Sequence, residues 1–358
     1  MAQSVLIVGS NRGWNLEGSY TRAFQKLGWT VHFWDPVEAL HRVARGYWLG
    51  RLFSTFVHIE PWFRKANLRL LQLVNTLRPD LILVIGTYGV WGGTLAQIRA
   101  VVPDILIYSI YPDTPHNLGS DRMHCLPFFD RVAVVSPAWV EAFERLGAPR
   151  VNYLPLAADP ELHYPVEKVK RASDPFCRDV VFVGNWRRDR EEFLEQLVDF
   201  DLGLWGSDYW KRRTRPGSPL RSRWGGRSIN GTELAQVCAA SRILLNVIDA
   251  VGWPGPNMRT FEQPACRAFS LVTRTPAIVE LFKEGETIEC FASAKEAQEK
   301  IAYYLAHERE RQRVAEASYQ FVIHGGHTYF DRARQIAEWA AEDRMLSTVG
   351  RAVAQVAL

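Results

Sequence analysis

The chain has 358 residues, 47% of them hydrophobic, so it is long enough for two domains and apolar enough to bury a core. Its 43 basic and 39 acidic residues give a net charge of +4, a balance too weak to predict a nucleic-acid partner. The five scattered cysteines form no C-x-x-C pair, so neither a disulfide framework nor a zinc site is indicated. The sequence shows no signal-peptide pattern and no apolar run approaching the ~20 residues of a transmembrane helix, so we expect a cytoplasmic protein.

Short β-branched runs alternate with helical patterns in the first half of the chain. Such runs are typical of strands in a parallel sheet that is covered by helices on both faces. We expect a helix from Glu17 to Leu27, closed by Gly28. The expected strands are Val5–Val8, Val31–Trp34, Leu81–Ile85, Ile105–Ser109 and Val132–Val135, with Asn152–Leu156 as a further candidate.

A second series of strands and helices follows a polar segment with three prolines, residues 157–178, which we interpret as a linker. The expected strands are Asp179–Val183, Leu202–Trp205, Ile243–Ile248, Ala268–Val272 and Thr287–Cys290. The expected helices are Arg190–Val198, Gly231–Ala240, Thr260–Arg267, Ala294–Ala306 and Glu308–Val322. The order of elements predicts an α/β protein with two doubly wound Rossmann-like domains that face each other across a cleft. They cover residues 1–156 and 179–327, and a C-terminal helix, 328–345, and a tail, 346–358, follow.

The most informative segment runs from Asn257 to Glu262, after the expected strand Ile243–Ile248 and a loop rich in glycine and proline. A strand, a loop and a helix start form the place where an open α/β sheet binds phosphates and riboses. The guanidinium of Arg259 is suited to clamp a diphosphate with two parallel hydrogen bonds. The carboxylate of Glu262 is suited to accept hydrogen bonds from both hydroxyls of a ribose. The segment therefore predicts a sugar-nucleotide site.

Two other strand ends in the second half carry candidate ligand groups. Gly184 allows a close approach of the backbone, and Arg188 and Arg190 bring cations to a helix start, where an anion would offset their repulsion by the helix dipole. The alternative interpretation is a solvated arginine cluster. Trp205 and Gly206 follow the next strand, where the indole either borders a nucleobase or fills the space between strand and helix.

The segment Lys211–Arg227 holds seven basic residues and one tryptophan. It is a candidate contact for an anionic membrane, for a phosphate-bearing acceptor or, less well, for nucleic acid. A solvated loop is the alternative, and it is the commoner origin of such runs.

The first half offers candidate groups for the acceptor. The loop Gly9–Gly18 is not a G-x-G-x-x-G motif, so it gives little support to a dinucleotide cofactor, and Asn11 and Trp14 are candidate acceptor contacts. Asp113 and His116 follow an expected strand and are candidates for a general base or a sugar-hydroxyl contact, against the alternative of a proline-rich turn with an aspartate cap. Two glycines separate His324 from His327, so a metal pair is not predicted.

At these residues the chain resembles the CgeB family of spore maturation proteins, which are glycosyltransferase-like and have the GT-B fold. The resemblance extends from Val5 to about Ala340. The best-matching segments are Asp130–Pro165, Phe182–Arg190, Asn246, Arg259 with Phe261 and Glu262, Ile278–Phe291, and His327-Thr328-Tyr329 with Arg332.

The resemblance implies transfer of a sugar from a UDP-, GDP- or TDP-type donor held by the C-terminal domain to a glycan, protein or small-molecule acceptor. Glu262 matches the family's ribose-binding glutamate, whereas Pro254 stands where many GT-B retaining enzymes carry a second glutamate near the sugar. Asn257 or Arg259 is the expected substitute, and the backbone near Ile229 is the expected contact of the nucleobase. The expected donor-binding residues are Gly184, Asn185, Arg188, Arg190, Trp205, Gly206, Ile229, Asn246, Asn257, Arg259, Thr260, Phe261 and Glu262.

The mechanism that fits this implication needs no metal or other cofactor. Arg188, Arg259 and helix N-termini would stabilise the leaving diphosphate electrostatically. A retaining reaction, which we prefer, needs no strong protein base; an inverting one would use Asp113. Asp113, His116 and Arg259 are therefore the catalytic candidates.

Two alternatives remain open. A GT-B epimerase or hydrolase would use the same donor, and a non-catalytic binding or assembly protein would keep only the donor pocket. Pro254 favours the second alternative, whereas the costly burial of Arg259 and Glu262 without a ligand argues against it.

Overall fold

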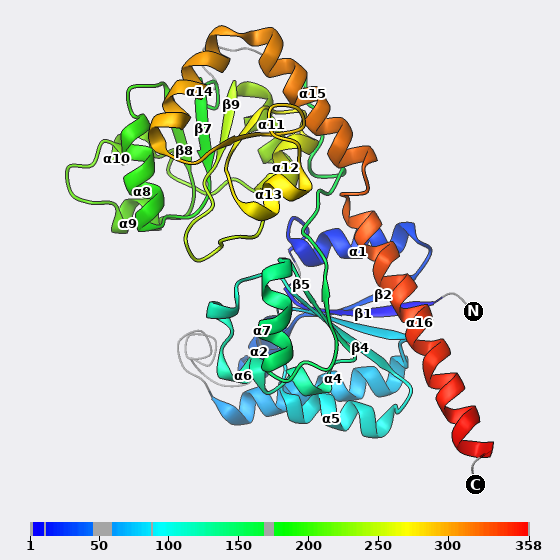
Figure 1. Ribbon diagram of the computed structural model, residues 1–358. Helices are drawn as coiled ribbons and strands as arrows, with labels where there is room; N and C mark the ends of the chain where they lie inside the picture. The colour runs from blue at the N-terminus through cyan, green and yellow to red at the C-terminus, as the bar shows by residue number, and fades with distance from the viewer. Residues whose placement is uncertain (1–2, 11, 46–58, 87–88, 168–174, 357–358) are drawn as a thin grey trace. The chain divides into compact units, whose positions relative to one another are not determined.

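The computed structural model describes residues 3–10, 12–45, 59–86, 89–167 and 175–356 (Figure 1). The chain folds into two compact units, the first formed by residues 1–154 with 329–358 and the second by residues 155–328. Among the described residues, none of the helices combines the length and the apolar composition needed to cross a bilayer.

In the described part of the first unit, six parallel strands form one sheet in the order β2-β1-β3-β4-β5-β6. The strands are β1 Ser4–Val8, β2 Thr30–Trp34, β3 Leu81–Ile85, β4 Leu106–Tyr111, β5 Arg131–Val134 and β6 Val151–Tyr153. The helices are α1 Leu16–Lys26, α2 Pro36–Ala44, α4 Glu60–Leu77, α5 Gly92–Val101, α6 Ser120–Met123, α7 Val140–Arg145 and α16 Tyr329–Val356. Every residue of β3 is buried, as a strand covered on both faces requires.

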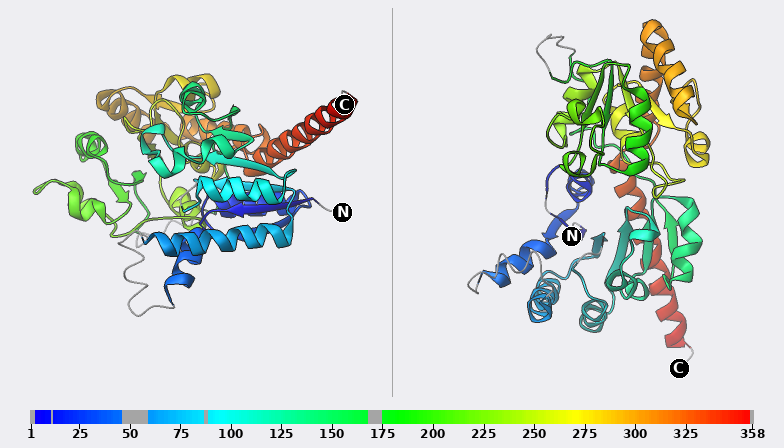
Figure 2. Two further views of the ribbon diagram at one scale, coloured as in Figure 1. Left: turned by 90° about the horizontal axis from the view of Figure 1, so that it is seen from below. Right: turned by 90° about the vertical axis from the view of Figure 1, so that its left-hand side faces the viewer.

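In the described part of the second unit, five parallel strands follow the order β11-β10-β9-β7-β8. The strands are β7 Val180–Val183, β8 Leu202–Trp205, β9 Ile243–Asn246, β10 Ser270–Thr273 and β11 Glu289–Phe291. The helices are α8 Arg188–Leu194, α9 Tyr209–Arg213, α10 Leu220–Arg223, α11 Thr232–Ala240, α12 Arg259–Ala265, α13 Pro276–Leu281, α14 Ala294–Ala306 and α15 Glu308–His324. The helices α14 and α15, drawn in orange, contact each other (Figures 1 and 2).

Alternate residues of β7 enter two separate apolar clusters. Val180 and Phe182 belong to one cluster, and Val181 and Val183 belong to the other. Because successive side chains of a strand point to opposite faces, the sheet is buried on both sides. The two parallel, doubly wound sheets expected from the sequence are confirmed.

Some element bounds differ from the sequence predictions. The strand β9 ends at Asn246 instead of Ile248, because the amide of Ile248 donates to the Thr273 hydroxyl, at 3.0 Å, instead of to a neighbouring strand. The helix α16 continues to Val356, through residues that the sequence pattern assigned to a tail. It packs along α1 within the first unit (Figure 1).

One carboxylate of α16 ties this helix to the first sheet. Asp343 accepts hydrogen bonds from the Arg131 Nε atom at 2.7 Å, from Arg150 at 2.6 Å and from the Tyr108 hydroxyl. Burial raises the pKa of Asp343, but the hydrogen bonds from Arg131 and Tyr108 and the nearby arginine charges outweigh it, so the pKa lies below its usual value. The strands β4 and β5 are thereby anchored to the C-terminal helix.

We expect the Asp343→Asn substitution to lower the free energy of unfolding of the first unit by about 2 kcal/mol, because two arginines lose a charged acceptor. Urea denaturation at neutral pH measures the change. Glu342→Gln is the matched control: its mostly exposed carboxylate also contacts Arg131, at 3.1 Å, and its loss is expected to cost less than about 0.5 kcal/mol. Equal effects of the two substitutions would contradict the anchoring role of Asp343.

Candidate functional site

The strand order of the second unit indicates where a ligand binds. The chain proceeds from β7 to β8 on one side and from β9 to β10 and β11 on the other, so the order reverses between β7 and β9. In open parallel sheets, ligands bind at the carboxyl ends of the strands beside such a reversal. These ends are Val183 with Gly184, and Asn246. The residues around them therefore form the candidate site.

Three polar side chains fasten the loop after β9 to the start of α12. Asn246 and Asn257 exchange two amide hydrogen bonds, at 3.0 and 2.7 Å. Asn246 also donates to the Thr260 hydroxyl at 3.1 Å, and the Thr260 amide donates to the Asn257 side chain at 3.3 Å. The structure thus brings these three expected donor residues together, and their hydrogen bonds shape the loop that leads to Arg259 at the start of α12.

Arg259 connects α12 with two other segments of the second unit. Its Nε atom lies 3.4 Å from the carbonyl oxygen of Val183, and its Nη2 atom lies 3.5 Å from that of Ile229. Its Nη1 atom forms an ion pair with Glu262. The side chain is 22% exposed, so the guanidinium is held in place and yet open to a ligand. The expected contacts Arg259, Glu262 and the backbone of Ile229 therefore meet at the end of β7.

Two residues that the sequence predictions missed complete this cluster. His163 lies with its Nε2 atom 3.6 Å from a carboxylate oxygen of Glu262, and its Nδ1 atom accepts the amide hydrogen of Asp159 at 3.3 Å. A ring nitrogen that accepts a hydrogen bond leaves the proton on the other nitrogen, so the N–H of His163 faces Glu262. The side chains of His163, Asp159 and Glu262 are buried.

The electrostatic balance of the cluster keeps Glu262 ionised. The residue is 3% exposed, and this burial raises its pKa. The charge of Arg259, the electrostatic influence of His163 and the Arg259 hydrogen bond act in the opposite direction and prevail, so the pKa lies below its usual value. The neighbouring Asp159 opposes them by a smaller amount. A charged acceptor at this position suits hydroxyl groups of a ligand.

The two expected glycines after β7 and β8 have a packing role. A Cβ atom at Gly206 would collide with the carbonyl oxygen of Gly184 and with the Trp210 indole, and one at Gly184 would collide with Phe182. The indole N–H of Trp210 donates to the Gly184 carbonyl at 2.8 Å. The two loops therefore pack against each other at these glycines.

The remaining candidates near β7 and β8 differ in their surroundings. Trp205 is buried against the Phe176 ring at 5.3 Å, so its indole fills the core, as in the second of the two interpretations of this residue. Arg190 donates to the carbonyls of Val247, at 3.0 Å, and Asn185, at 3.1 Å, which joins the loops after β7 and β9. Burial lowers the pKa of Arg190 despite the nearby Asp249 and Asp189.

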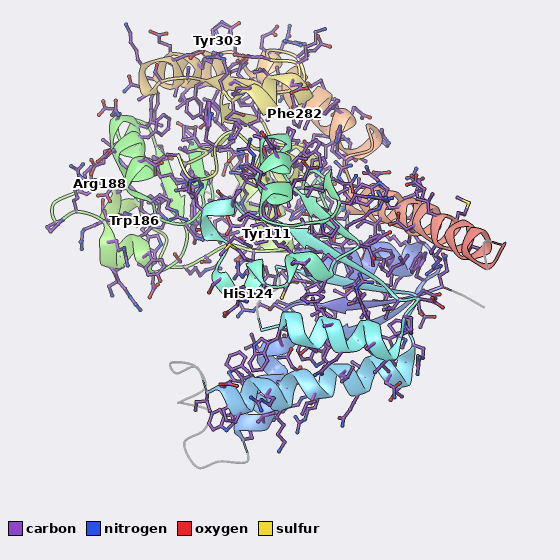
Figure 3. All side chains as sticks on the ribbon, turned by 60° about the horizontal axis from the view of Figure 1, so that its bottom comes forward. Tyr111, His124, Trp186, Arg188, Phe282 and Tyr303 are labelled. Carbon is purple, nitrogen blue, oxygen red and sulfur yellow. The ribbon has the colours of Figure 1, made fainter. Side chains whose placement is uncertain are left out.

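The first residue of α8 is turned away from these loops. The Arg188 side chain is 84% exposed and pairs with Glu192 one turn further along the helix, at 3.0 Å (Figure 3). The indole N–H of the neighbouring Trp186 donates to the buried carboxylate of Glu191 at 2.7 Å. The structure therefore places the arginines of this segment in two environments, one buried and bonded and one solvated.

The segment around α12 contains further expected contacts. Phe261 is fully buried and packs against the rings of Phe282, at 6.0 Å, and His327, at 5.9 Å. Pro254 follows the exposed Trp253 in the loop between β9 and α12. The first-turn amides of Thr260, Phe261 and Glu262 already have acceptors within the chain, so these amides are not available to a phosphate.

The acceptor candidates that the structure describes in the first unit are exposed. The Asp113 carboxylate accepts hydrogen bonds from the Thr114 amide and the Asn117 side chain, both at 2.8 Å, whereas the cap of the short helix that follows is Thr114. The Nδ1 atom of His116 lies 3.1 Å from the Thr114 hydroxyl. The exposed Trp14 has the Arg12 guanidinium over its ring at 5.9 Å, and Asn11 lies outside the described residues.

A buried carboxylate that was missed by the sequence predictions lies at the end of the glycine-rich segment Gly9–Gly18. Glu17, in the first turn of α1, accepts the amide hydrogen of Ser10 at 2.9 Å. Burial raises its pKa, and the backbone hydrogen bonds only partly oppose this. An acidic residue eight positions after Gly9 was the only sequence signal for this group.

Most of the basic residues between Lys211 and Arg227 have partners within the second unit. Arg215 pairs with Glu191 and Glu195, and Arg227 pairs with Glu233. The others with carboxylate partners are Arg212 with Asp208 and Arg223 with Asp201. Arg213 stacks on two aromatic rings, at 5.3 and 5.8 Å. Four of the seven basic side chains are thus paired with carboxylates of the unit that carries them.

No cluster of three or more histidine, cysteine, aspartate or glutamate side chains that could hold a metal ion occurs in the part of the chain that the structure describes. The cysteines found there are free thiols.

Comparison with known proteins identifies the fold. Residues 187–338 match a family model described as glycosyl transferase-like. No curated protein matches the sequence.

Solved structures are similar over nearly the whole chain. Sucrose-phosphate synthase from Thermosynechococcus elongatus has a TM-score of 0.65 at 13% identity, covering 95% of this chain and 98% of its own. Anabaena HepE in complex with UDP and glucose has a TM-score of 0.63 at 15% identity, covering 95% and 100%. Trehalose 6-phosphate synthase from Burkholderia multivorans has a TM-score of 0.64 at 13% identity, covering 98% of each chain. Each of the two α/β units contains a parallel sheet. Together with these similarities, this shows that the chain has the two-domain GT-B fold, with a C-terminal part that matches a glycosyl transferase-like family.

Proposed function

We propose that the chain is a glycosyltransferase that moves a sugar from a nucleoside-diphosphate sugar to an acceptor. The carrying observation is the pair Arg259 and Glu262, which lie one helical turn apart beside the reversal of strand order. A cation open to a diphosphate and a carboxylate held ionised for ribose hydroxyls are the two groups that such a donor needs. The match of residues 187–338 to a glycosyl transferase-like family supports this proposal.

We infer that uridine diphosphate is the nucleotide part of the donor. Structures of Anabaena HepE with UDP and with UDP-glucose share the fold, which makes UDP the first nucleotide to test, ahead of GDP and TDP. In our proposal Arg259 binds the diphosphate and Glu262 binds the ribose. The backbone of Ile229, whose carbonyl oxygen lies 3.5 Å from Arg259, contacts the base. Asn246 and Asn257 hold the loop in place.

We further propose a retaining reaction that uses no metal ion. The protein then supplies electrostatic stabilisation of the leaving diphosphate and no strong general base. The acceptor, a glycan, a protein or a small molecule, binds the first unit near Trp14, Asp113 and His116. We also propose that the chain is related to the CgeB family and is located in the cytoplasm. The segment Lys211–Arg227 would make a peripheral contact with a membrane.

The test is incubation of the purified protein with UDP-, GDP- and TDP-sugars, with and without a chelator and with candidate acceptors. Released nucleotide and the fate of the sugar are followed by mass spectrometry. A glycosylated acceptor is the expected product. Free sugar would establish a hydrolase, an isomerised nucleotide sugar would establish an epimerase, and binding without turnover would establish a non-catalytic binding protein.

A substitution at His163 tests the ribose contact. We expect His163→Leu to weaken UDP binding about tenfold, a loss of about 1–2 kcal/mol, because an apolar side chain replaces the polar imidazole that lies 3.6 Å from the Glu262 carboxylate and helps to keep it ionised. His163→Gln, whose amide keeps a donor in the same direction, is expected to bind UDP within about threefold of the wild type. Isothermal titration calorimetry measures both constants. Equal weakening by leucine and glutamine would contradict a positioning role for the N–H.

A further inference from the structure

A polar cavity lies at the amino ends of the strands of the second sheet. Its volume is about 360 Å³, and it is lined by residues that precede β9 and β10 and by the first two turns of α15. Because these are the amino ends of the strands, the cavity is separate from the site of Arg259 and Glu262, which lies at the carboxyl ends, at the other end of the short helix α12. We propose that this cavity binds a phosphate group, either as free phosphate or as a small phosphate monoester. The proposal is independent of the proposed transferase activity.

The walls of the cavity are cationic. Arg242, Arg267 and Arg311 line it, and Glu316 is the carboxylate among the lining residues. Arg242 pairs with Asp179 at 3.1 Å, and Arg267 pairs with Glu316 at 3.0 Å. Both ion pairs are about half exposed, and such pairs contribute little stability, so an entering anion displaces them at little cost.

Arg311 is a buried cation with few hydrogen-bond acceptors around its guanidinium. Its side chain is 8% exposed, and its Nη1 atom donates a hydrogen bond to the carbonyl of Tyr304 at 2.5 Å. The nearest carboxylate oxygen, on Glu308, lies 3.8 Å from Nη2, beyond hydrogen-bonding distance. A guanidinium carries five N–H groups, and among the described residues the Arg311 side chain has one hydrogen-bond acceptor, the carbonyl of Tyr304.

The position of Arg311 on its helix adds a second unfavourable contribution to the burial of its charge. It is the fourth residue of α15, near the helix N-terminus, where a positive charge opposes the helix dipole. Arg242 and Arg267, in contrast, follow the C-terminal ends of α11 and α12, where the dipole favours a cation. Burial also lowers the pKa of Arg311. An anion in the cavity would relieve both costs of keeping Arg311 there.

The size and lining of the cavity select the kind of anion. About 360 Å³ is near the lower limit of small-molecule pockets, which suits one phosphate with a small substituent. Arginine forks match the oxygens of phosphate in pairs. Phe269, Ala268 and Ala315 provide an apolar wall beside the charges, against which a short carbon chain packs.

The test is thermal unfolding with inorganic phosphate and with glycerol 3-phosphate, each against sodium chloride at equal ionic strength. We expect either phosphate to raise Tm by about 2–4 °C at saturation. A rise with both probes shows that free phosphate is sufficient, whereas a rise with the ester alone shows that a monoester is required. Either result supports the proposal. No rise beyond that of sodium chloride overturns it.

Matched variants locate the binding. Arg267→Met, at a half-exposed position, and Arg311→Lys, which keeps the charge but loses the fork, are expected to weaken phosphate binding at least about tenfold. Arg313→Met, two residues along α15 and paired with Glu310, is expected to leave it unchanged. The Arg259→Ala protein is expected to keep the phosphate response. Loss of the response in Arg259→Ala alone would place the phosphate in the donor site and overturn the proposal.

Discussion

Replacing Arg259 with alanine is expected to weaken UDP binding by about 100-fold and to abolish sugar transfer. The substitution removes charged hydrogen bonds worth about 3 kcal/mol to a bound diphosphate. It also leaves the buried carboxylate of Glu262 without its ion-pair partner, so the remaining negative charge repels the diphosphate. Isothermal titration calorimetry with UDP measures the affinity, and circular dichroism checks that the variant is folded.

The control for this result is Arg178→Ala. Arg178 is also in the second unit and pairs with an aspartate, Asp201, at 3.1 Å, but it precedes β7 and so lies at the amino ends of the strands. We expect this variant to bind UDP as the wild type does. A folded Arg259→Ala protein with wild-type affinity would contradict the assignment of the diphosphate contact.

The second large effect is expected from Glu262→Gln, which we predict lowers the free energy of unfolding by about 3 kcal/mol at neutral pH. The substitution leaves Arg259 beside a neutral amide within a buried cluster, and breaking such a pair is costly. The folded state lowers the pKa of Glu262, so the unfolded chain takes up the proton first as the pH falls. The stabilisation is therefore complete above the unfolded pKa and is lost as the pH falls through the folded pKa.

Urea denaturation from neutral to acid pH measures this dependence. The difference between wild type and Glu262→Gln is expected to be constant near neutral pH and to shrink in the acid range. Glu280→Gln, which alters an exposed carboxylate of α13, is the control and is expected to change little at any pH. A difference that grows as the pH falls would contradict the electrostatic account of the cluster.

The fold could be predicted from the sequence where the pattern has one interpretation. The run Leu81–Ile85 is apolar throughout and short, so only a buried strand accommodates it, and β3 has these bounds. The helix α4 has no counterpart among the sequence predictions, although its buried positions Phe63, Ala66, Leu70 and Val74 follow helical spacing. That element was readable, because the spacing alone indicates one apolar face.

The candidate site could be predicted only in part, because its members come from separate segments. Arg259 and Glu262 lie three residues apart, so a helix start places both on one face. His163 lies about 100 residues earlier in an irregular segment, where no local pattern connects it with Glu262. A glycine after a strand allows either a close approach of a ligand or tight packing within the protein. Only the collision of a Cβ at Gly206 with Gly184 and Trp210 shows that packing requires it.

The most direct test of the central claim is a crystal structure of the protein with UDP bound. We predict that the diphosphate lies within about 3 Å of the Arg259 guanidinium and that the ribose hydroxyls donate to Glu262. Electron density for UDP at another place, or none at concentrations that saturate binding in solution, would contradict the donor site at the carboxyl ends of β7 and β9.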